Sequence, residues 1–168
     1  LLINVPVGIY NTVLYTEPGK KYEIALPPFQ PILKRDILNP FFQPVEIYLG
    51  IKNTDSLDIN LMIAEFDDLY SNYVDSNYYY IFSHPRAANV DSVISLLEQQ
   101  FEGVDNIFFR DYRTYKYAWL KYISYMRDYR YIIREYYHDT PFLYQNPAYM
   151  DLFNQLFTNY LSFYMTKK

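Results

Sequence analysis

Apolar and polar positions alternate with a two-residue period in the first third of the chain. In segments 22–26 and 45–49, large apolar side chains stand at every second position, the pattern of a half-buried strand. A further strand is expected near residues 10–16. Residues 1–54 are therefore predicted to hold three or four strands, which are too few to close a sandwich and look like part of an incomplete one.

Turn and proline residues divide these strands. Residues 17–20 read Glu-Pro-Gly-Lys, and this turn is expected to join the strand near 10–16 to one near 21–26. The segment 27–31, Pro-Pro-Phe-Gln-Pro, cannot continue that strand inside a sheet, because proline has no N–H to donate. It is predicted to be a crossing loop.

From Asp55 onward the apolar period becomes helical. Asp55 is placed to cap the first helix, and Asn146 with Pro147 provides a cap and a first residue for the last one. Gly103 suits the position after the end of the second helix. Four helices are predicted from apolar stripes with steps of three and four residues, namely Ile59, Ile63, Phe66, Tyr70 and Tyr73; Val90, Ile94, Leu97 and Phe101; Phe108, Tyr112, Tyr115, Trp119, Tyr122, Met126, Tyr129 and Ile133; and Tyr149, Phe153, Leu156, Tyr160 and Phe163.

The third stripe is the longest, and it predicts one unbroken helix from Phe108 to Ile133 with Trp119 buried midway. A stacking platform for sugars or bases would need rings that face solvent, whereas this regular spacing is typical of a buried seam. The fold class is therefore α+β, with a β-rich segment over residues 1–54 and an aromatic-rich helical domain over residues 55–168.

Aromatic residues are unusually frequent: they make up 21% of the chain, and 22 of them are tyrosines. The tyrosines outside the stripes cannot all be buried, and an apolar ring with a polar hydroxyl suits an interface. Half-burial at an ordinary surface explains them equally well. The residues proposed for an interaction face are Tyr78, Tyr79, Tyr117, Tyr125, Tyr131 and Tyr137.

Charge is divided between the predicted helices. Segment 105–139 carries seven of the fifteen basic residues, whereas segment 53–85 carries six acidic residues and no basic one. Ion pairing between the first and third helices explains this better than an anion-binding stripe. The net charge of −4 also argues against a nucleic-acid partner.

No constellation with catalytic or metal-binding chemistry is found. The chain has no Cys, which excludes disulfides and thiolate chemistry, and His84 and His138 have no partner at ligand spacing. Gly-rich phosphate loops, a nucleophile elbow and a transmembrane segment are also missing. No catalytic, cofactor-binding or metal-binding residue is predicted, and no cofactor is expected. Because the chain opens on Leu1 and not on Met, it is interpreted as part of a longer protein.

Several segments together resemble a known family. They are Val5-Pro6-Val7-Gly8-Ile9-Tyr10, segment 21–29, Asn39-Pro40-Phe41-Phe42-Gln43-Pro44, segment 55–60, Phe109-Arg110-Asp111-Tyr112, segment 122–129 and segment 147–157. The combination is similar to the region upstream of the thioredoxin-like domain in Bacteroidetes thiol–disulfide oxidoreductase-like envelope proteins.

The resemblance implies an N-terminal β-sandwich, a helical middle region and a redoxin domain that follows, in the periplasm or outer envelope. Because a Cys-x-x-Cys pair is missing, no catalytic residue is carried over. The chain is predicted to be a non-enzymatic accessory region that contacts another domain of its parent chain or a protein partner. The alternatives are a glycan- or peptide-binding module that uses surface tyrosines, and a purely structural or oligomerisation domain.

Overall fold

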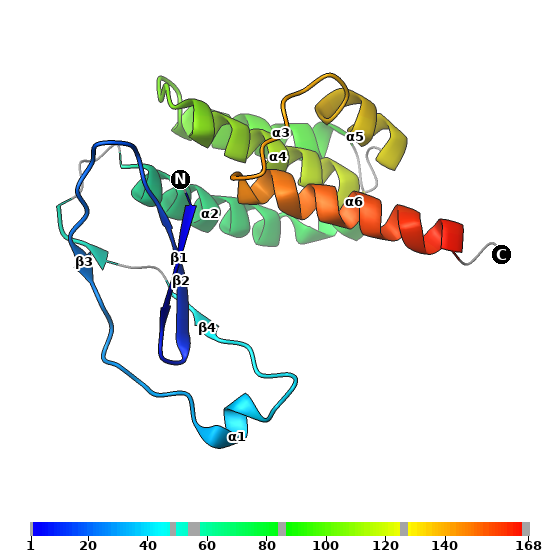
Figure 1. The fold of residues 1–168 in the computed structure, drawn as a ribbon. Coiled ribbons are helices and arrows are strands. Elements are labelled where there is room, and N and C mark those ends of the chain that lie inside the picture. Colours follow the sequence, from blue (N-terminus) through cyan, green and yellow to red (C-terminus); the bar gives the residue numbers. More distant parts are fainter. Residues whose placement is uncertain (1, 48–49, 54–57, 84–86, 125–127, 166–168) are drawn as a thin grey trace. The chain divides into compact units, whose positions relative to one another are not determined.

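The structure is a computed structural model that describes residues 2–47, 50–53, 58–83, 87–124 and 128–165. The chain forms two compact units, Leu1–Ala64 and Glu65–Lys168. Strands lie in the first unit, and helices dominate the second (Figure 1). The predicted α+β fold class, a short β-rich segment followed by aromatic helices, is confirmed.

A hairpin of two strands opens the first unit. Strand β1 (Leu2–Val7) pairs with β2 (Tyr10–Tyr15) antiparallel, from Leu2 opposite Tyr15 to Val7 opposite Tyr10. The chain reverses at Gly8, whose φ of +61° favours glycine. The Ile9 N–H donates to the carbonyl oxygen of Gln30 over 2.9 Å, so the crossing loop is fastened to this turn.

The prediction that the strand near 10–16 pairs with the strand near 21–26 is wrong. The turn at 17–20 exists, with Gly19 at φ +80°, but β3 (Ile24–Ala25) pairs antiparallel with β5 (Gly50–Ile51) and not with β2. Strand β2 pairs instead with β1, and in parallel with β4 (Val45–Glu46). Strand β2 pairs with β1 because six residues of each strand match in register. Strand β3 has only two residues that take part in strand pairing.

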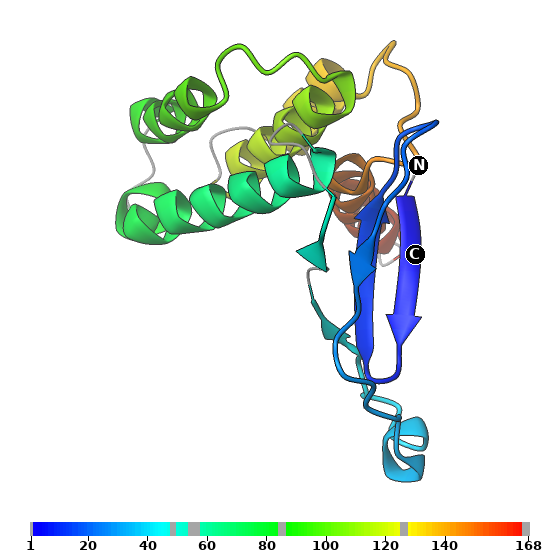
Figure 2. The same ribbon diagram turned by 90° about the vertical axis from the view of Figure 1, so that its left-hand side faces the viewer.

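A short helix that was not predicted follows the crossing loop. Helix α1 covers Lys34–Ile37, and none of its residues is buried. In both views it lies beyond the end of the hairpin where the chain turns at Gly8 (Figures 1 and 2). It is too short to show an apolar stripe, so the periodicity of the sequence carries no signal for it.

Helix α2 (Ile59–Ser76) begins in the first unit and continues into the second. The predicted cap, Asp55, lies outside the described residues. The buried Asp58 accepts hydrogen bonds from the backbone N–H and the side-chain Nδ2 of Asn60. The amide of Asn60 in turn bonds both the N–H and the carbonyl of Tyr15, at 2.8 and 2.9 Å, and so fastens the end of β2 to the start of α2.

The remaining helices form the second unit. A π-helical segment, η1 (Tyr79–Ser83), leads toward α3 (Ala87–Gln100), and Gly103 follows α3 with φ +81°. Asn106 caps α4 (Ile107–Ile123), Asp128 caps α5 (Tyr129–Tyr136) and Asn146 caps α6 (Pro147–Met165). The predicted signals around Gly103, Asn146 and Pro147 are thus confirmed.

The single long helix predicted from Phe108 to Ile133 is wrong. Helix α4 ends at Ile123, and the side chain of Asp128 starts α5 by accepting from the N–H of Tyr131 over 2.8 Å. Met126 of the stripe lies outside the described residues. A capping acid within the stripe outweighs the apolar period, because it satisfies N–H groups that have no partner at a helix start.

Burial along α4 follows the predicted stripe only in part: Tyr112 and Tyr115 are buried as predicted. Trp119 is only half-buried, and its indole N–H donates to Oε1 of Gln155 over 3.1 Å. Tyr117 and Ala118, which lie outside the stripe, are buried instead. The reason is that α4 is covered on several sides, with α3, α5 and α6 all against it, so that buried positions spread around the helix.

Phe66 is the centre of the first aromatic cluster. Its ring is fully buried on α2, and the rings around it lie 5.7–6.0 Å away, mostly edge-on. This geometry places the positive edge of one ring against the negative face of the next. The partners of Phe66 are Tyr70, Phe101, Phe109, Tyr112 and Tyr117.

A second aromatic cluster joins α4, α5 and α6. Tyr149 lies 4.8 Å from both Tyr115 and Tyr137, and Phe153 stacks one turn further along α6. The hydroxyl of Tyr115 donates to the Tyr136 carbonyl, and the hydroxyl of Tyr137 donates to the Tyr149 carbonyl. The hydroxyls of Tyr115 and Tyr137 are therefore both paired with backbone carbonyls.

Ion pairs connect α4 to the two helices before it. Lys116 lies 3.0 Å from Asp67 of α2, whose carboxylate also accepts from the hydroxyl of Tyr112. Arg113, a buried residue, lies 2.9 Å from Glu98 of α3. The predicted charge pairing of the first and third helices is confirmed by Lys116 and Asp67, whereas Arg127 lies outside the described residues.

Alkaline pH is expected to destabilise the helical unit. Burial raises the pKa of Tyr115 to about 12, and burial likewise raises the pKa of Tyr70, Tyr117 and Tyr137 above the ordinary value near 10. Above pH 10 the unfolded chain loses these protons before the folded one, so stability is full below pH 10 and falls as pH rises.

An absorbance titration of tyrosinate, run beside far-ultraviolet circular dichroism, measures this effect. The buried tyrosines are expected to ionise only together with loss of helix. A single smooth titration of all tyrosines before any unfolding would contradict the burial of these hydroxyls.

Candidate interaction surfaces

Two of the six tyrosines proposed for an interaction face lie at an exposed surface. Tyr78 is 60% exposed and Tyr79 56% exposed, beside and within η1, and the adjacent Tyr80 is equally exposed. Ile81 of the same segment is fully buried and anchors it. Tyr78 lies 4.8 Å from Phe82, so the rings form a small solvent-facing cluster.

Three of the other four do not join that cluster. Tyr117 is a core residue, only 7% exposed, and its hydroxyl donates to Glu98 over 2.8 Å. Tyr137 belongs to the second aromatic cluster, and Tyr131 is partly exposed on α5. Tyr125 lies outside the described residues. The sequence could not separate these cases, because a helix covered on several sides buries tyrosines that lie off the main stripe.

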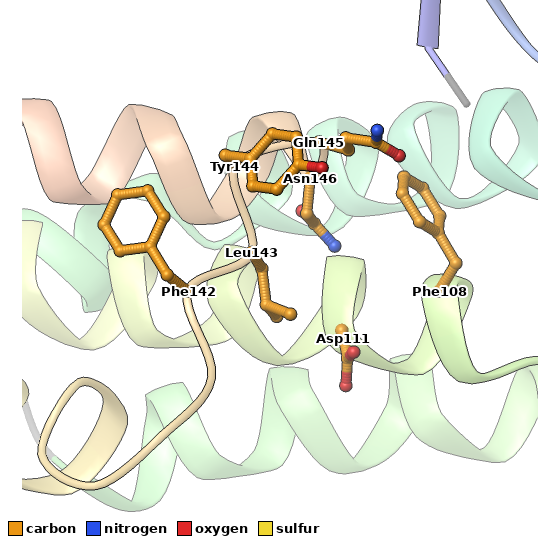
Figure 3. A pocket seen from close by; sticks show the side chains of 7 residues that line it. All are labelled: Phe108, Asp111, Phe142, Leu143, Tyr144, Gln145 and Asn146. Carbon is orange, nitrogen blue, oxygen red and sulfur yellow. The ribbon is translucent and has the colours of Figure 1, made fainter.

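A hollow that the sequence did not reveal lies between α4 and the segment that leads into α6. Figure 3 shows its lining: side chains from α4 and a run of five residues that ends at the cap of α6. Its volume is about 220 Å³. The lining residues are Phe108, Asp111, Phe142, Leu143, Tyr144, Gln145 and Asn146.

Two polar groups line this hollow, the side-chain amide of Asn146 and the carboxyl of Asp111. The side-chain nitrogen of Asn146 is buried without an acceptor among the described residues. Asp111 is partly buried; burial raises the pKa of its carboxyl, and the nearby charge of Arg110 opposes that rise. Asn146 was recognised in the sequence as a helix cap, which accounts for its oxygen but not for its nitrogen.

The first unit carries a run of exposed apolar side chains between β3 and β4. Leu38 is 81% exposed and Phe41 is 87% exposed, on and just after α1. We call this run the apolar segment; its members are Leu26, Phe29, Ile37, Leu38 and Phe41. Proline spacing predicted a loop here, but the periodicity gave no sign that its large side chains would face solvent.

The described residues offer little for metal or acid–base chemistry. No group of three or more potential metal ligands occurs in the described ranges. His84 lies outside them, and His138 is exposed at the end of α5 with its Nδ1 2.9 Å from the carboxylate of Asp139. Among the helices described, none combines the length and the apolar character needed to span a membrane.

Comparison with known proteins gives no family for the chain. The resemblance to the region upstream of a redoxin domain therefore stays a prediction from the sequence. No protein-family model, no curated protein and no solved structure matches this sequence.

Proposed function

We propose that this chain is a non-catalytic accessory region that presents its apolar segment to another folded domain. The observation that carries the proposal is the exposure of the five side chains of that segment, each at least 60% exposed. Large apolar side chains exposed together along one stretch of chain are typical of a surface that another molecule covers.

The energetics favour a covered state. Burying one such side chain contributes about 1.5–3 kcal/mol, so a partner that covers several of them gains substantially from this segment alone. The first unit has few large buried side chains of its own, among them Leu14, Ile59 and Ile63. A small core of this kind gains from an added surface, because small units bury too little apolar area by themselves.

The partner that the family resemblance suggests is a thioredoxin-like domain in the bacterial envelope. Thiol–disulfide exchange requires a thiolate, and this chain has no Cys. Under this proposal the redox step belongs to the partner domain, and this chain positions it. The exposed tyrosines Tyr78 and Tyr79 offer additional contact area on the helical unit.

Hydrogen–deuterium exchange, read by mass spectrometry, tests the proposal. The 168-residue chain alone is compared with the protein in which, under this proposal, it stands beside a thioredoxin-like domain. Peptides that cover residues 26–45 are expected to exchange at least about tenfold more slowly in that protein, because a covering domain protects amides from local opening. Peptides from α4 serve as the internal reference and are expected to exchange equally in both.

A double variant sharpens the test. Leu38→Ser with Phe41→Ser changes side chains that are almost fully exposed, so the melting temperature of the chain is expected to stay within about 2 °C while the protection in the protein with the thioredoxin-like domain is lost. Leu96→Ser with Ile107→Ser is the matched control, because it removes exposed apolar side chains outside the segment. Equal exchange in both proteins would contradict the proposal. Protection that grows with the concentration of the chain alone would favour self-association instead.

A further inference from the structure

The side-chain nitrogen of Asn146 is a buried donor that lacks an acceptor. Asn146 is only 3% exposed, and its other polar groups are all satisfied. Its Oδ1 accepts from the N–H of Tyr149, its carbonyl accepts from the N–H of Met150, and its own N–H donates to the Leu143 carbonyl. Only Nδ2 has no partner among the described residues. Buried donors of this kind are rare, and each one calls for an explanation.

The residue that carries the unused donor lines the hollow. In Figure 3 the amide nitrogen of Asn146 points toward α4, the helix that contributes Phe108 and Asp111. The carboxyl of Asp111 lines the same hollow and makes no hydrogen bond or ion pair with any described residue. The hollow therefore combines one donor and one acceptor, neither of which is paired with a residue in the described part of the chain.

Aromatic rings form the walls around these groups. Phe142 is held edge-on against Tyr149 and Phe153, with ring centroids 5.4 and 5.5 Å away, so its position is fixed before a ligand arrives. Tyr144 is 69% exposed at the rim. Apolar walls with a few convergent polar groups are typical of small-ligand sites. The volume of about 220 Å³ lies below the range of about 300–1,000 Å³ of drug-sized sites, and it suits a single ring-sized unit.

We propose that this hollow binds one saccharide unit, with a hydroxyl oxygen accepting from Asn146 Nδ2, a neighbouring hydroxyl donating to Asp111, and the apolar C–H face of the sugar against Phe142 and Tyr144. The proposal is independent of the apolar segment of the first unit. It assigns a ligand to residues of α4 and α6 instead of to the tyrosines first proposed for contact.

Other ligand classes fit the same groups less well. An ammonium or guanidinium group has no acceptor to offer Nδ2 of Asn146. An anion would meet the carboxylate of Asp111. A single water molecule would satisfy Asn146 but leave the aromatic walls unused.

NMR titration of the chain with methyl glycosides of glucose, galactose and mannose tests the proposal. At least one of them is expected to give saturable chemical-shift changes confined to Phe108, Asp111 and residues 142–146. A small neutral ligand of this size is expected to bind with a dissociation constant of about 1–10 mM.

Two variants separate the role of Asn146 in the hollow from its role as the cap of α6. Asn146→Ser keeps an oxygen that caps α6 but removes the unused donor, and it is expected to weaken binding at least tenfold. Asn106→Ser is the matched control, since Asn106 caps α4 by accepting from Phe109 and does not line the hollow. The Asn106→Ser variant is expected to bind the glycosides with the same affinity as the original chain. Tyr144→Ala, at the exposed rim, gives a second reduction in affinity that does not depend on the cap.

Several results would overturn the assignment. No saturable change with any glycoside up to about a hundred times the lowest expected dissociation constant would mean that only water occupies the hollow. Equal binding by Asn146→Ser and the original chain would exclude the proposed donor. Saturation by N-acetylglycine N-methylamide in place of the glycosides would show that the hollow recognises a peptide group.

Discussion

Replacing Phe66 by Ala is expected to lower the free energy of unfolding of the helical unit by about 3–5 kcal/mol, the largest loss from any single truncation in that unit. The ring is fully buried, and the five rings around it come from α2, α4 and the end of α3. Removing it loses its transfer free energy and leaves a cavity that three helices cannot easily close.

Chemical denaturation followed by circular dichroism measures this loss. Phe66→Leu fills most of the same space, so we expect it to cost clearly less than Phe66→Ala, about 1–2 kcal/mol. Tyr80→Ala is the exposed control, because its ring is 56% exposed, and its expected cost is about 0.5 kcal/mol or less. If Phe66→Ala cost no more than Tyr80→Ala, the aromatic cluster around Phe66 would not be the core of this unit.

The sequence predicted the helical unit well because its signals are local. The apolar stripes of α2, α3 and α6 and the caps at Asn146 and Gly103 all depend on neighbours within one or two turns. The β-rich unit was predicted less well, since strand pairing depends on distant residues. Nothing local distinguishes β1 from β3 as the partner of β2, although six matched positions against two decide it in the fold.

The break between α4 and α5 shows where a periodic pattern misleads. Asp128 lies between two members of a regular apolar stripe, Met126 and Tyr129. In the structure its side chain caps α5, and this capping signal is as local as the stripe that hid it. Two local signals conflicted, and the one that satisfies backbone N–H groups determined where the helix begins.

The hollow at Asn146 could not be predicted by the same means. Its two polar groups are 35 residues apart in the sequence, and no pattern links Asp111 to the cap of α6. Tyr117 gives the opposite case: it was expected at a surface, but the packing of several helices around α4 buries it. Both depend on which faces of α4 are covered, and only the fold decides that.

Gly8→Ala is expected to destabilise the first unit by about 2–5 kcal/mol, through backbone strain and a clash that cannot relax. Gly8 has φ +61°, and an added Cβ would overlap the carbonyl oxygen of Gln30 and lie 2.8 Å from its carbon. The obstacle is backbone, which no change of rotamer can move. The same carbonyl accepts from the N–H of Ile9, so shifting it would also break the bond that fastens the crossing loop to the hairpin.

Gly19→Ala separates the two causes of this loss. Gly19 also has a positive φ, +80°, but an added Cβ would meet nothing within 4 Å. It therefore carries only the conformational cost, about 1 kcal/mol. Amide exchange of β1 and β2 measures both variants, and we expect protection to fall at least about tenfold further in Gly8→Ala than in Gly19→Ala, since 1.4 kcal/mol corresponds to a factor of ten. Equal losses would mean that the Gln30 carbonyl does not hold the turn, and the crossing loop would then be free to leave the hairpin together with the apolar segment that it carries.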